Sequence, residues 1–287
     1  MKEFARQMEI QSCCDQVNGQ HLHYLHAGAG RPLLLIHGLL GGSFCWRFNL
    51  PVLAQRHSVY ALDLPGMGLS DAQRDCNCSM QAQADRVLEF IEHEKMAEVD
   101  VIGSSWGGAV SLLMAVDNPK IRSLILCAPV NPWSTLGSNR ICFFTGLVGS
   151  MLLRYGLRYG GRYHRPALEA MYGDRSRIPP GTLEGYGELI QRKGRGHNLL
   201  NILQNWKHDV ETMTAVLPRV SARCLLIWGT HDRAVDPRST TLLQEAIPSC
   251  RTVMVDSVGH LPFEEDPEVF NRLALDFLNE PEHAMGN

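Results

Sequence analysis

The chain has 287 residues, 45% of them hydrophobic, and a net charge of −3, which suits one large domain and excludes a nucleic-acid-binding surface over the whole protein. No stretch reaches the roughly 18 consecutive apolar residues of a membrane-spanning helix, and we expect no secretion signal. The nine cysteines are scattered and do not resemble a disulfide framework, so we expect reduced thiols in a cytoplasmic protein.

The first predicted elements form a hairpin over residues 9–28, whose two alternating runs meet across Asn18-Gly19. Six short apolar runs follow, at residues 33–36, 58–62, 99–103, 121–128, 223–229 and 251–255. Helical patterns separate most of them, for example at residues 81–93. Apolar runs without alternation suit strands buried on both faces. The sequence therefore predicts an α/β fold around a mostly parallel sheet.

One interval breaks this alternation of strands and helices. Some ninety residues of mainly helical character separate the run that ends near Ala128 from the run that begins near Arg223. Such an interval is too long for a simple crossover in a compact sheet. We therefore expect residues 131–215 to form an inserted helical lid, and residues 1–130 and 216–287 to form the core.

Two adjacent serines lie where the run at residues 99–103 gives way to a helical pattern. Ser105 has glycines two positions before and two positions after it, a G-x-S-x-G frame that Ser104 lacks. This frame suits a serine on a sharp turn from strand to helix, where neighbouring backbone passes close to it. At such a turn the backbone N–H of Trp106 points toward a developing oxyanion. We therefore expect Ser105 to be a nucleophile.

A serine nucleophile needs a base and an acid that orients the base. His260 is the candidate base, because it lies in a glycine-preceded loop after the last predicted strand. Asp232 follows the penultimate strand and is our candidate acid. Asp236 is the rival, but it stands beside a proline, where it can cap the next helix. The predicted catalytic residues are Ser105, Asp232 and His260, in the order expected for such a fold.

The loop after the run at residues 33–36 is rich in glycine and is the candidate second half of an oxyanion hole. Its sequence is HGLLGG, from His37 to Gly42, and we expect the backbone N–H of Leu39 to be the donor. His37 is expected to be a buried residue that braces this loop, not a catalytic base. His231 is expected to be only a neighbour of Asp232.

Together these segments resemble the α/β-hydrolase superfamily across nearly the whole chain. The matching segments are HGLLGG at 37–42, DLPGMGLSD at 63–71, GSSWGG at 103–108, WGTHD at 228–232 and GHLPFEEDP at 259–267. The resemblance implies an eight-stranded, mostly parallel sheet with flanking helices. It also implies a serine hydrolase with an acyl-enzyme intermediate that water cleaves, and neither a cofactor nor a metal ion.

The resemblance also indicates which branches of this superfamily fit the sequence less well. Haloalkane dehalogenases and epoxide hydrolases of this fold carry Asp at the position of Ser105, which argues against both. Meta-cleavage C–C bond hydrolases often place Trp after the catalytic histidine, where this chain has Leu261. His21, His23 and His26 cluster in the hairpin without neighbouring carboxylates, so we expect no metal site there.

The predicted lid carries the expected substrate specificity. Phe143, Phe144, Leu147 and Met151 recur at helical spacing, and we expect them to present apolar surface to the substrate pocket. The sequence therefore predicts a serine carboxylic-ester hydrolase for small or medium apolar esters. Three alternatives stay open: a thioesterase or methyl-esterase for carrier-bound acyl groups, a C–C bond hydrolase, and a slow-turnover ligand receptor.

The predicted lid is also basic, with eleven Lys and Arg against six Asp and Glu in residues 131–215. Arg154, Arg158 and Arg162 recur at four-residue steps and would share one helical face. A solvated basic face is the default interpretation of such a pattern. The alternative is a face that docks an acidic carrier protein or anionic lipid.

Overall fold

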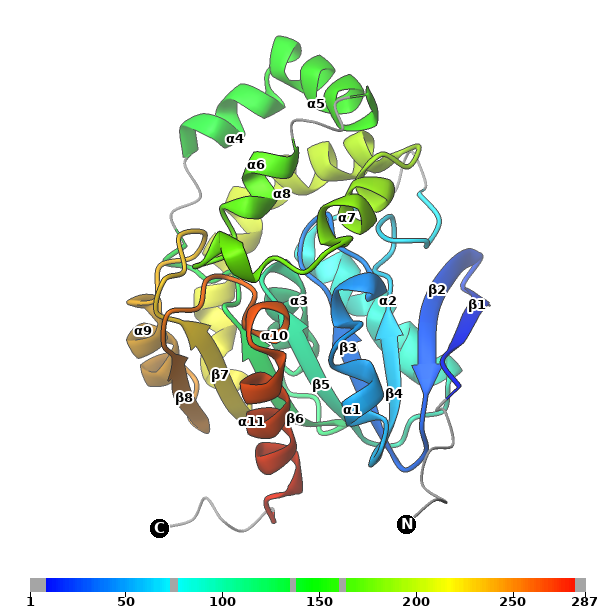
Figure 1. Ribbon diagram of the computed structural model, residues 1–287, viewed down its shortest axis with the longest axis vertical. Coiled ribbons are helices and arrows are strands. Elements are labelled where there is room, and N and C mark those ends of the chain that lie inside the picture. Colours follow the sequence, from blue (N-terminus) through cyan, green and yellow to red (C-terminus); the bar gives the residue numbers. More distant parts are fainter. Residues whose placement is uncertain (1–8, 73–76, 135–137, 160–163, 282–287) are drawn as a thin grey trace.

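The computed structural model describes residues 9–72, 77–134, 138–159 and 164–281 (Figure 1). At its centre is one eight-stranded sheet with the strand order β1-β2-β4-β3-β5-β6-β7-β8. The strands are β1 (Gln11–Val17), β2 (Gln20–Ala27), β3 (Arg31–Ile36), β4 (His57–Leu62), β5 (Val99–Ser104), β6 (Ile121–Cys127), β7 (Arg223–Gly229) and β8 (Cys250–Val255). Only the pairings β1–β2 and β2–β4 are antiparallel in this sheet. The predicted α/β fold with a mostly parallel sheet is confirmed.

The hairpin at the start of the sheet turns where the sequence predicts it. Asn18 and Gly19 both have positive φ, 46° and 80°, and Val17 pairs with Gln20. Two consecutive residues with positive φ form the tight turn whose twist matches that of the flanking strands. The hairpin therefore adds the two strands that run antiparallel at this edge of the sheet.

Helices cover both faces of the sheet (Figure 1). They are α1 (Leu50–Leu53), α2 (Met80–His93), α3 (Trp106–Met114), α4 (Ser138–Thr145), α5 (Leu147–Tyr159), α6 (His164–Glu169), α7 (Thr182–Ile190), α8 (Arg195–Val216), α9 (Ser239–Ala246), α10 (Pro262–Glu265) and α11 (Pro267–Asn279), with 3₁₀ turns at Ser43–Trp46, Arg175–Arg177 and Leu217–Arg219. None of these helices is long and apolar enough to cross a membrane.

The sheet separates two hydrophobic cores, because successive side chains of a strand point to opposite faces. Leu33 and Leu35 of β3 pack with α1 and α11, whereas Leu34 and Ile36 pack with α2 and α3. All four side chains are fully buried. This two-sided burial explains why the central strands read as continuous apolar runs.

Helices α4 to α8 connect β6 to β7 and lie over the carboxyl ends of the parallel strands (Figure 1). The last of them, α8, also packs on the core. Its Trp206 stacks on Trp106 at the start of α3, with the ring centroids 5.3 Å apart. The connection between β6 and β7 therefore packs against the edge of the sheet at which Ser105 lies.

Hydrogen bonds also connect α8 to the loop at residues 63–71. The guanidinium of Arg195 donates hydrogen bonds to the backbone carbonyls of Gly66, Gly68 and Ser70. Burial lowers the pKa of Arg195 to about 10, so its side chain stays charged at neutral pH. The loop itself folds around Asp63, whose Oδ2 accepts a 2.7 Å hydrogen bond from Leu69 N–H.

Asp63 also contacts the hairpin. His23 Nδ1 lies 2.7 Å from Asp63 Oδ2, and the N–H of Ser43 donates to Oδ1. Burial alone raises the pKa of Asp63, but the His23 hydrogen bond and nearby donors outweigh it and lower that pKa below its usual value. Gly68 has a φ of 53°, and a Cβ there would overlap the Asp63 carboxylate, which explains the glycine in this segment.

Candidate active site

Ser105 occupies a strained turn between β5 and α3. Its φ of 52° and ψ of −116° lie in a region that residues other than glycine rarely adopt. Three backbone hydrogen bonds hold this conformation: Ser105 N–H donates to Cys127 O at 2.9 Å, and Ser105 O accepts from Ala109 N–H at 3.2 Å and Val130 N–H at 3.0 Å. The turn lifts the side chain out of the strand, as a nucleophile elbow does.

The glycines around Ser105 are required by space. A Cβ at Gly103 would lie 2.8 Å from Gly107 O, and a Cβ at Gly107 would lie 2.6 Å from Ile36 O. Both distances are far below ordinary van der Waals contact. Ser104, by contrast, is the last residue of β5 and is buried. The G-x-S-x-G frame is therefore a steric requirement of the turn at Ser105.

The structure brings His260 and Asp232 together. His260 Nδ1 lies 2.8 Å from Asp232 Oδ2, and both side chains are buried. Asp232 Oδ1 accepts hydrogen bonds from Ala234 N–H at 2.8 Å and Val235 N–H at 3.1 Å, which fix the carboxylate. Because a carboxylate accepts the proton on Nδ1, Nε2 is left with its lone pair. His260 and Ser105 line the same cavity.

The rival residues lie elsewhere. Asp236 forms an ion pair with Arg238, with Oδ2 2.6 Å from Nη2, just before α9. His231 is exposed on the surface. Among the described residues, Asp232 is thus the carboxylate that contacts His260.

The loop after β3 is braced from within by His37. Leu64 N–H donates to Nε2 of His37 at 3.0 Å, and Nδ1 of His37 donates to Gly38 O at 2.7 Å. Burial lowers the pKa of His37, so the imidazole is neutral and each nitrogen has a defined partner. The prediction that His37 is a buried brace is confirmed.

The same loop approaches Ser105 closely. A Cβ at Gly38 would lie 3.2 Å from Ser105 Cβ, and the next residue, Leu39, lines the cavity with Ser105. Trp106 is the first residue of α3, so its backbone N–H is one of those that have no acceptor within the helix. One residue with a predicted donor therefore follows Ser105 in the chain, and the other lines the same cavity.

The cavity beside Ser105 has a volume of about 270 Å³. Besides the residues already described, it is lined by side chains that include Leu168, Met171, Tyr186, Ile190 and Val235. These come mostly from α6, α7 and the segment between them. The cavity wall is therefore largely apolar.

The four residues predicted for the pocket lie away from this cavity. Phe143, Leu147 and Met151 are exposed on α4 and α5, and Phe144 packs at the edge of the core cluster around α8. None of the four is among the described residues that line the cavity beside Ser105. Helices α6 and α7 line the cavity instead, because the apolar stripe of α5 faces outward.

Two glutamates that the sequence analysis did not single out connect the His260 loop to the β6–β7 helices. Glu265 accepts backbone N–H bonds from Gly173 and Asp174 at 2.9 Å each and from Gly259 at 2.8 Å. Next to it, the N–H of His260 donates to Met171 O at 2.6 Å. Glu265 therefore positions the backbone immediately before His260.

Glu264 is the second of these glutamates. Its buried carboxylate accepts hydrogen bonds from the hydroxyls of Tyr172 and Tyr186 and pairs with Arg47 at 3.0 Å. Burial and the nearby Glu264 carboxylate raise the pKa values of both tyrosines, which keeps them protonated as donors. The only sequence signal for either residue is the pair of acidic residues after His260 in GHLPFEEDP.

Comparison with known proteins identifies the family of this chain. The sequence model described as "Alpha/beta hydrolase family" matches residues 33–273, which include Ser105, Asp232 and His260. The chain belongs to this family. The alpha/beta hydrolase described here is 27% identical over 271 residues to an uncharacterised hydrolase, YugF, of Bacillus subtilis (strain 168), covering 92% of this chain and 95% of that protein.

Two further relatives of this alpha/beta hydrolase carry more specific names. Lipase 3 of Moraxella sp. (strain TA144) is 29% identical over 242 residues, which cover 82% of this chain and 73% of the lipase. The solved structure of the epoxide hydrolase CorEH has a TM-score of 0.82 at 24% identity and covers 94% of this chain and 99% of its own. At 24% identity, the likeness to CorEH shows only that the two proteins share a fold.

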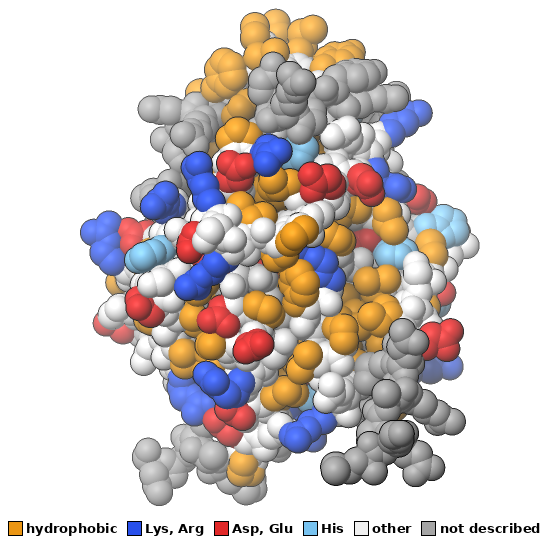
Figure 2. Space-filling model, in the orientation of Figure 1, with side chains coloured by type: hydrophobic (Ala, Val, Ile, Leu, Met, Phe, Trp, Pro, Cys, Tyr) orange, Lys and Arg blue, Asp and Glu red, His pale blue; other side chains and the backbone are white. Residues whose placement is uncertain are grey.

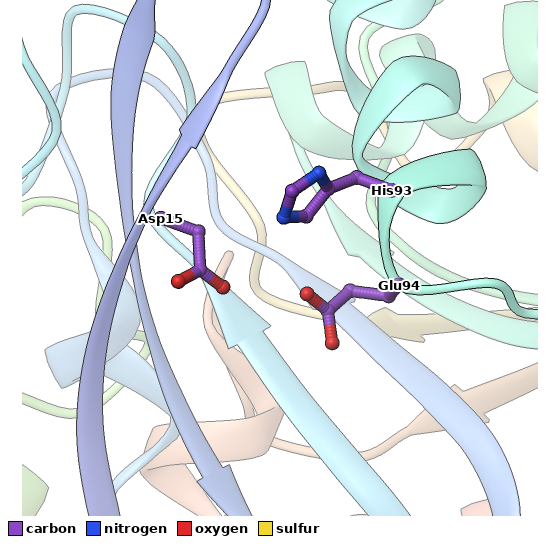
Figure 3. A group of neighbouring side chains, drawn as sticks. All are labelled: Asp15, His93 and Glu94. Atoms are coloured by element: carbon purple, nitrogen blue, oxygen red, sulfur yellow. The ribbon is translucent and has the colours of Figure 1, made fainter.

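A different cluster of polar side chains lies at the hairpin edge of the alpha/beta hydrolase. Asp15 of β1 faces His93 and Glu94 at the end of α2 (Figure 3), with one potential ligand atom from each within 4.8 Å of the others. Burial and then the negative charge of Asp15 raise the pKa of Glu94. Such partly exposed acidic groups are common without an ion.

The three hairpin histidines do not converge on a common point. His23 bonds to Asp63 and to Ser12, and His26 bonds to Ser58. His21 is exposed. The contacts of His23 and His26 thus stabilise the hairpin against its neighbours.

Proposed function

We propose that this alpha/beta hydrolase is a serine hydrolase that cleaves carboxylic esters with a small or medium-sized apolar acyl group. One observation carries the proposal. Ser105, on a strained turn, and His260, bonded to Asp232, line the same largely apolar cavity. A nucleophile, a base and an orienting acid next to an apolar site are the parts that ester hydrolysis needs.

The proposed reaction begins with a proton transfer. Nε2 of His260 takes the proton of the Ser105 hydroxyl while Oγ attacks the carbonyl carbon of the ester. Asp232 stabilises the imidazolium that forms, through its 2.8 Å contact with Nδ1. His260 then gives the proton to the leaving alcohol, and an acyl-enzyme on Ser105 remains. Water, deprotonated by His260, attacks that acyl-enzyme, and the acid leaves as His260 returns the proton to Oγ of Ser105.

The tetrahedral intermediates of both steps carry a negative oxygen. The backbone N–H groups of Leu39 and Trp106 are the proposed donors to it. Leu39 lines the cavity with Ser105 and Trp106 begins α3, and both facts support this assignment. Each donor of this kind contributes about 10²- to 10³-fold to kcat in serine hydrolases.

The cavity sets the proposed substrate class. Its volume of about 270 Å³ is just below the roughly 300–1,000 Å³ range of small-molecule sites, which favours a short acyl chain. Its described lining includes no Lys, Arg, Asp or Glu side chain. A charged acyl group would lose its hydration there without gaining a partner, so a neutral apolar group is favoured.

We further propose that residues 131–215 act as the lid of this site. Helices α6 and α7 supply part of the apolar wall, and Glu264 and Glu265 bind the segment between them to the His260 loop. Two relatives named as lipases, from Moraxella sp. and Psychrobacter immobilis, support ester chemistry. Ser105 itself argues against the epoxide-opening branch, in which the nucleophile is a carboxylate.

The test combines an activity panel with covalent labelling. We expect p-nitrophenyl esters of graded chain length to be hydrolysed over many turnovers, faster than matched acyl thioesters. Ser105→Ala should lower kcat by about 10⁴-fold or more and abolish fluorophosphonate labelling. Ser104→Ala is the matched control and should keep both.

Three outcomes would reject the proposal. A fluorophosphonate adduct on Ser104 would show that Ser105 is not the nucleophile. A preference for thioesters or for C–C bond substrates would assign a different reaction to the same residues. One slow turnover per protein molecule, without further cycles, would mark a ligand receptor.

A further inference from the structure

The outer surface of α5 is apolar, although it faces solvent. Its large side chains Leu147, Val148, Met151, Leu152 and Tyr155 are between 55% and 83% exposed. At about 100° of rotation per residue these five positions lie on one side of the helix, here called the outer apolar face. Leu153, on the opposite side, is buried. Helix α5 is thus apolar on its exposed side as well.

The outer apolar face extends onto α4. Phe143 there is 51% exposed, and Figure 2 shows hydrophobic side chains gathered at the top of the molecule over these two helices. On the other side α5 rests directly on α8, since a Cβ at Gly196 would lie 2.6 Å from Arg154 Cα. Single exposed apolar residues are ordinary, but a contiguous group of six marks an interaction surface.

Most of the charges beside this surface are positive. Between Asp117 and Glu169 the sequence contains no Asp or Glu, and residues 138–165 contain five arginines. Arg154 is exposed beside the outer apolar face, and it lines a groove of about 980 Å³ together with Arg192 and Lys193. Met151, Tyr155 and the exposed acid Asp71 line the same groove, so its positive side chains outnumber its negative one. The apolar surface therefore has a cationic rim.

The four-residue spacing of arginines that the sequence analysis noted is only partly described. Arg154 is described, whereas the side chain of Arg158 and the whole of Arg162 lie outside the described residues. The cationic rim therefore rests on Arg154, Arg192 and Lys193.

We propose that α4 and α5 dock this protein onto the surface of an anionic lipid bilayer, with α5 lying in the plane of the interface. Aliphatic side chains such as Leu147 and Leu152 enter the boundary of the acyl chains, and Tyr155 reaches the headgroup level. Arg154, Arg192 and Lys193 meet the lipid phosphates. With 13 residues, α5 is too short to cross the bilayer.

The chemistry of the surface favours lipid over an acidic protein. An acidic carrier protein would pair with the arginines alone and leave five large apolar side chains in water. An anionic bilayer satisfies both the apolar face and its cationic rim, because it presents phosphates and hydrocarbon at adjacent depths. This proposal does not depend on the ester chemistry at Ser105.

The experiment measures sedimentation of the full-length protein with vesicles. We expect at least tenfold tighter partitioning to phosphatidylcholine vesicles that contain about 30% phosphatidylglycerol than to pure phosphatidylcholine vesicles. The double variant Met151→Ser, Leu152→Ser should lower partitioning by about 100-fold, since each side chain loses its apolar burial. Arg154→Glu should lower it by about fivefold or more at low salt and have less effect at high salt.

A fluorescence measurement locates the contact. Lipids with brominated acyl chains should quench the tryptophan fluorescence of the Leu152→Trp variant more than that of the wild type. They should not do so for Leu242→Trp, which changes an exposed apolar position on α9, outside α4 and α5. Leu242→Ser serves as the matched control for sedimentation and should bind vesicles as the wild type does.

Four results would overturn the proposal. The first is the absence of binding to anionic vesicles, and the second is equal binding by the wild type and the Met151→Ser, Leu152→Ser variant. The third is a wild-type dimer that does not bind vesicles and that becomes monomeric in this variant. The fourth is capture of an acidic carrier protein without vesicle binding. The third would assign the outer apolar face to a second copy of the chain, and the fourth to a protein partner.

Discussion

Glu265→Gln is expected to damage both stability and catalysis, although Glu265 does not line the cavity. In the wild type, Oε2 accepts N–H bonds from Gly173 and Gly259, and Oε1 accepts one from Asp174. A glutamine keeps one oxygen. Its best orientation retains the two bonds at the Oε2 position and turns an NH₂ group toward the N–H of Asp174.

The cost follows from these three bonds. Hydrogen bonds to a charged acceptor contribute about 1.5–3 kcal/mol each, against about 0.5–1.5 kcal/mol for neutral ones. The two retained bonds weaken by about 1 kcal/mol each, and the third, of about 2 kcal/mol, is lost. The expected loss of unfolding free energy is about 4 kcal/mol, which lowers Tm by about 7 °C in a chain of this size.

Catalysis should fall as well, because Gly259 immediately precedes His260. A catalytic group displaced by about 1 Å can cost about 100-fold in rate, so we expect kcat to drop by about 10- to 100-fold with a smaller change in KM. Thermal unfolding and ester kinetics measure the two effects. Glu268→Gln, an exposed substitution of the same type on α11, is the control. Wild-type kcat in a folded Glu265→Gln protein would refute the positioning role.

The other predictions concern single residues. Asp232→Asn should lower kcat on a model ester by about 10⁴-fold, and Asp236→Asn by less than about tenfold; the reverse order would show that Asp236 is the acid. Gly103→Ala should yield little folded protein on expression, because its Cβ would lie 2.8 Å from Gly107 O; a folded, fully active variant would contradict the steric argument. Burial and Asp15 raise the pKa of Glu94, so its contribution to stability is complete below the usual glutamate pKa near 4.5 and is lost as pH rises through the folded value. Glu94→Gln should therefore raise Tm at pH 7 but not at pH 4, and equal Tm values at pH 7 would contradict this.

The strand framework and the candidate catalytic residues could be predicted because both depend on local patterns. Asn18-Gly19 marks a tight turn by itself, and apolar runs mark strands with two buried faces. In a parallel sheet, residues that directly follow strands gather at one edge, so Asp232 and His260 could be expected to meet. The structure has them 2.8 Å apart.

The cavity wall could not be predicted in the same way. The stripe that includes Leu147 and Met151 predicts an apolar helix face, but periodicity does not identify what covers that face. In the structure it faces solvent, and α6 and α7 line the cavity instead. Glu264 has the appearance of an exposed acid at a helix start, yet it is buried by Arg47 and two tyrosines far away in sequence.

Arg195 has a consequence for how this protein can be recombined with its relatives. Its guanidinium comes from α8, but the three carbonyls that it binds belong to the loop at residues 63–71. A chimaera that received foreign β6–β7 helices without an arginine at this position would leave those buried carbonyls unpaired. The two segments therefore form one unit of exchange, and crossovers that transfer one of them alone should yield misfolded protein.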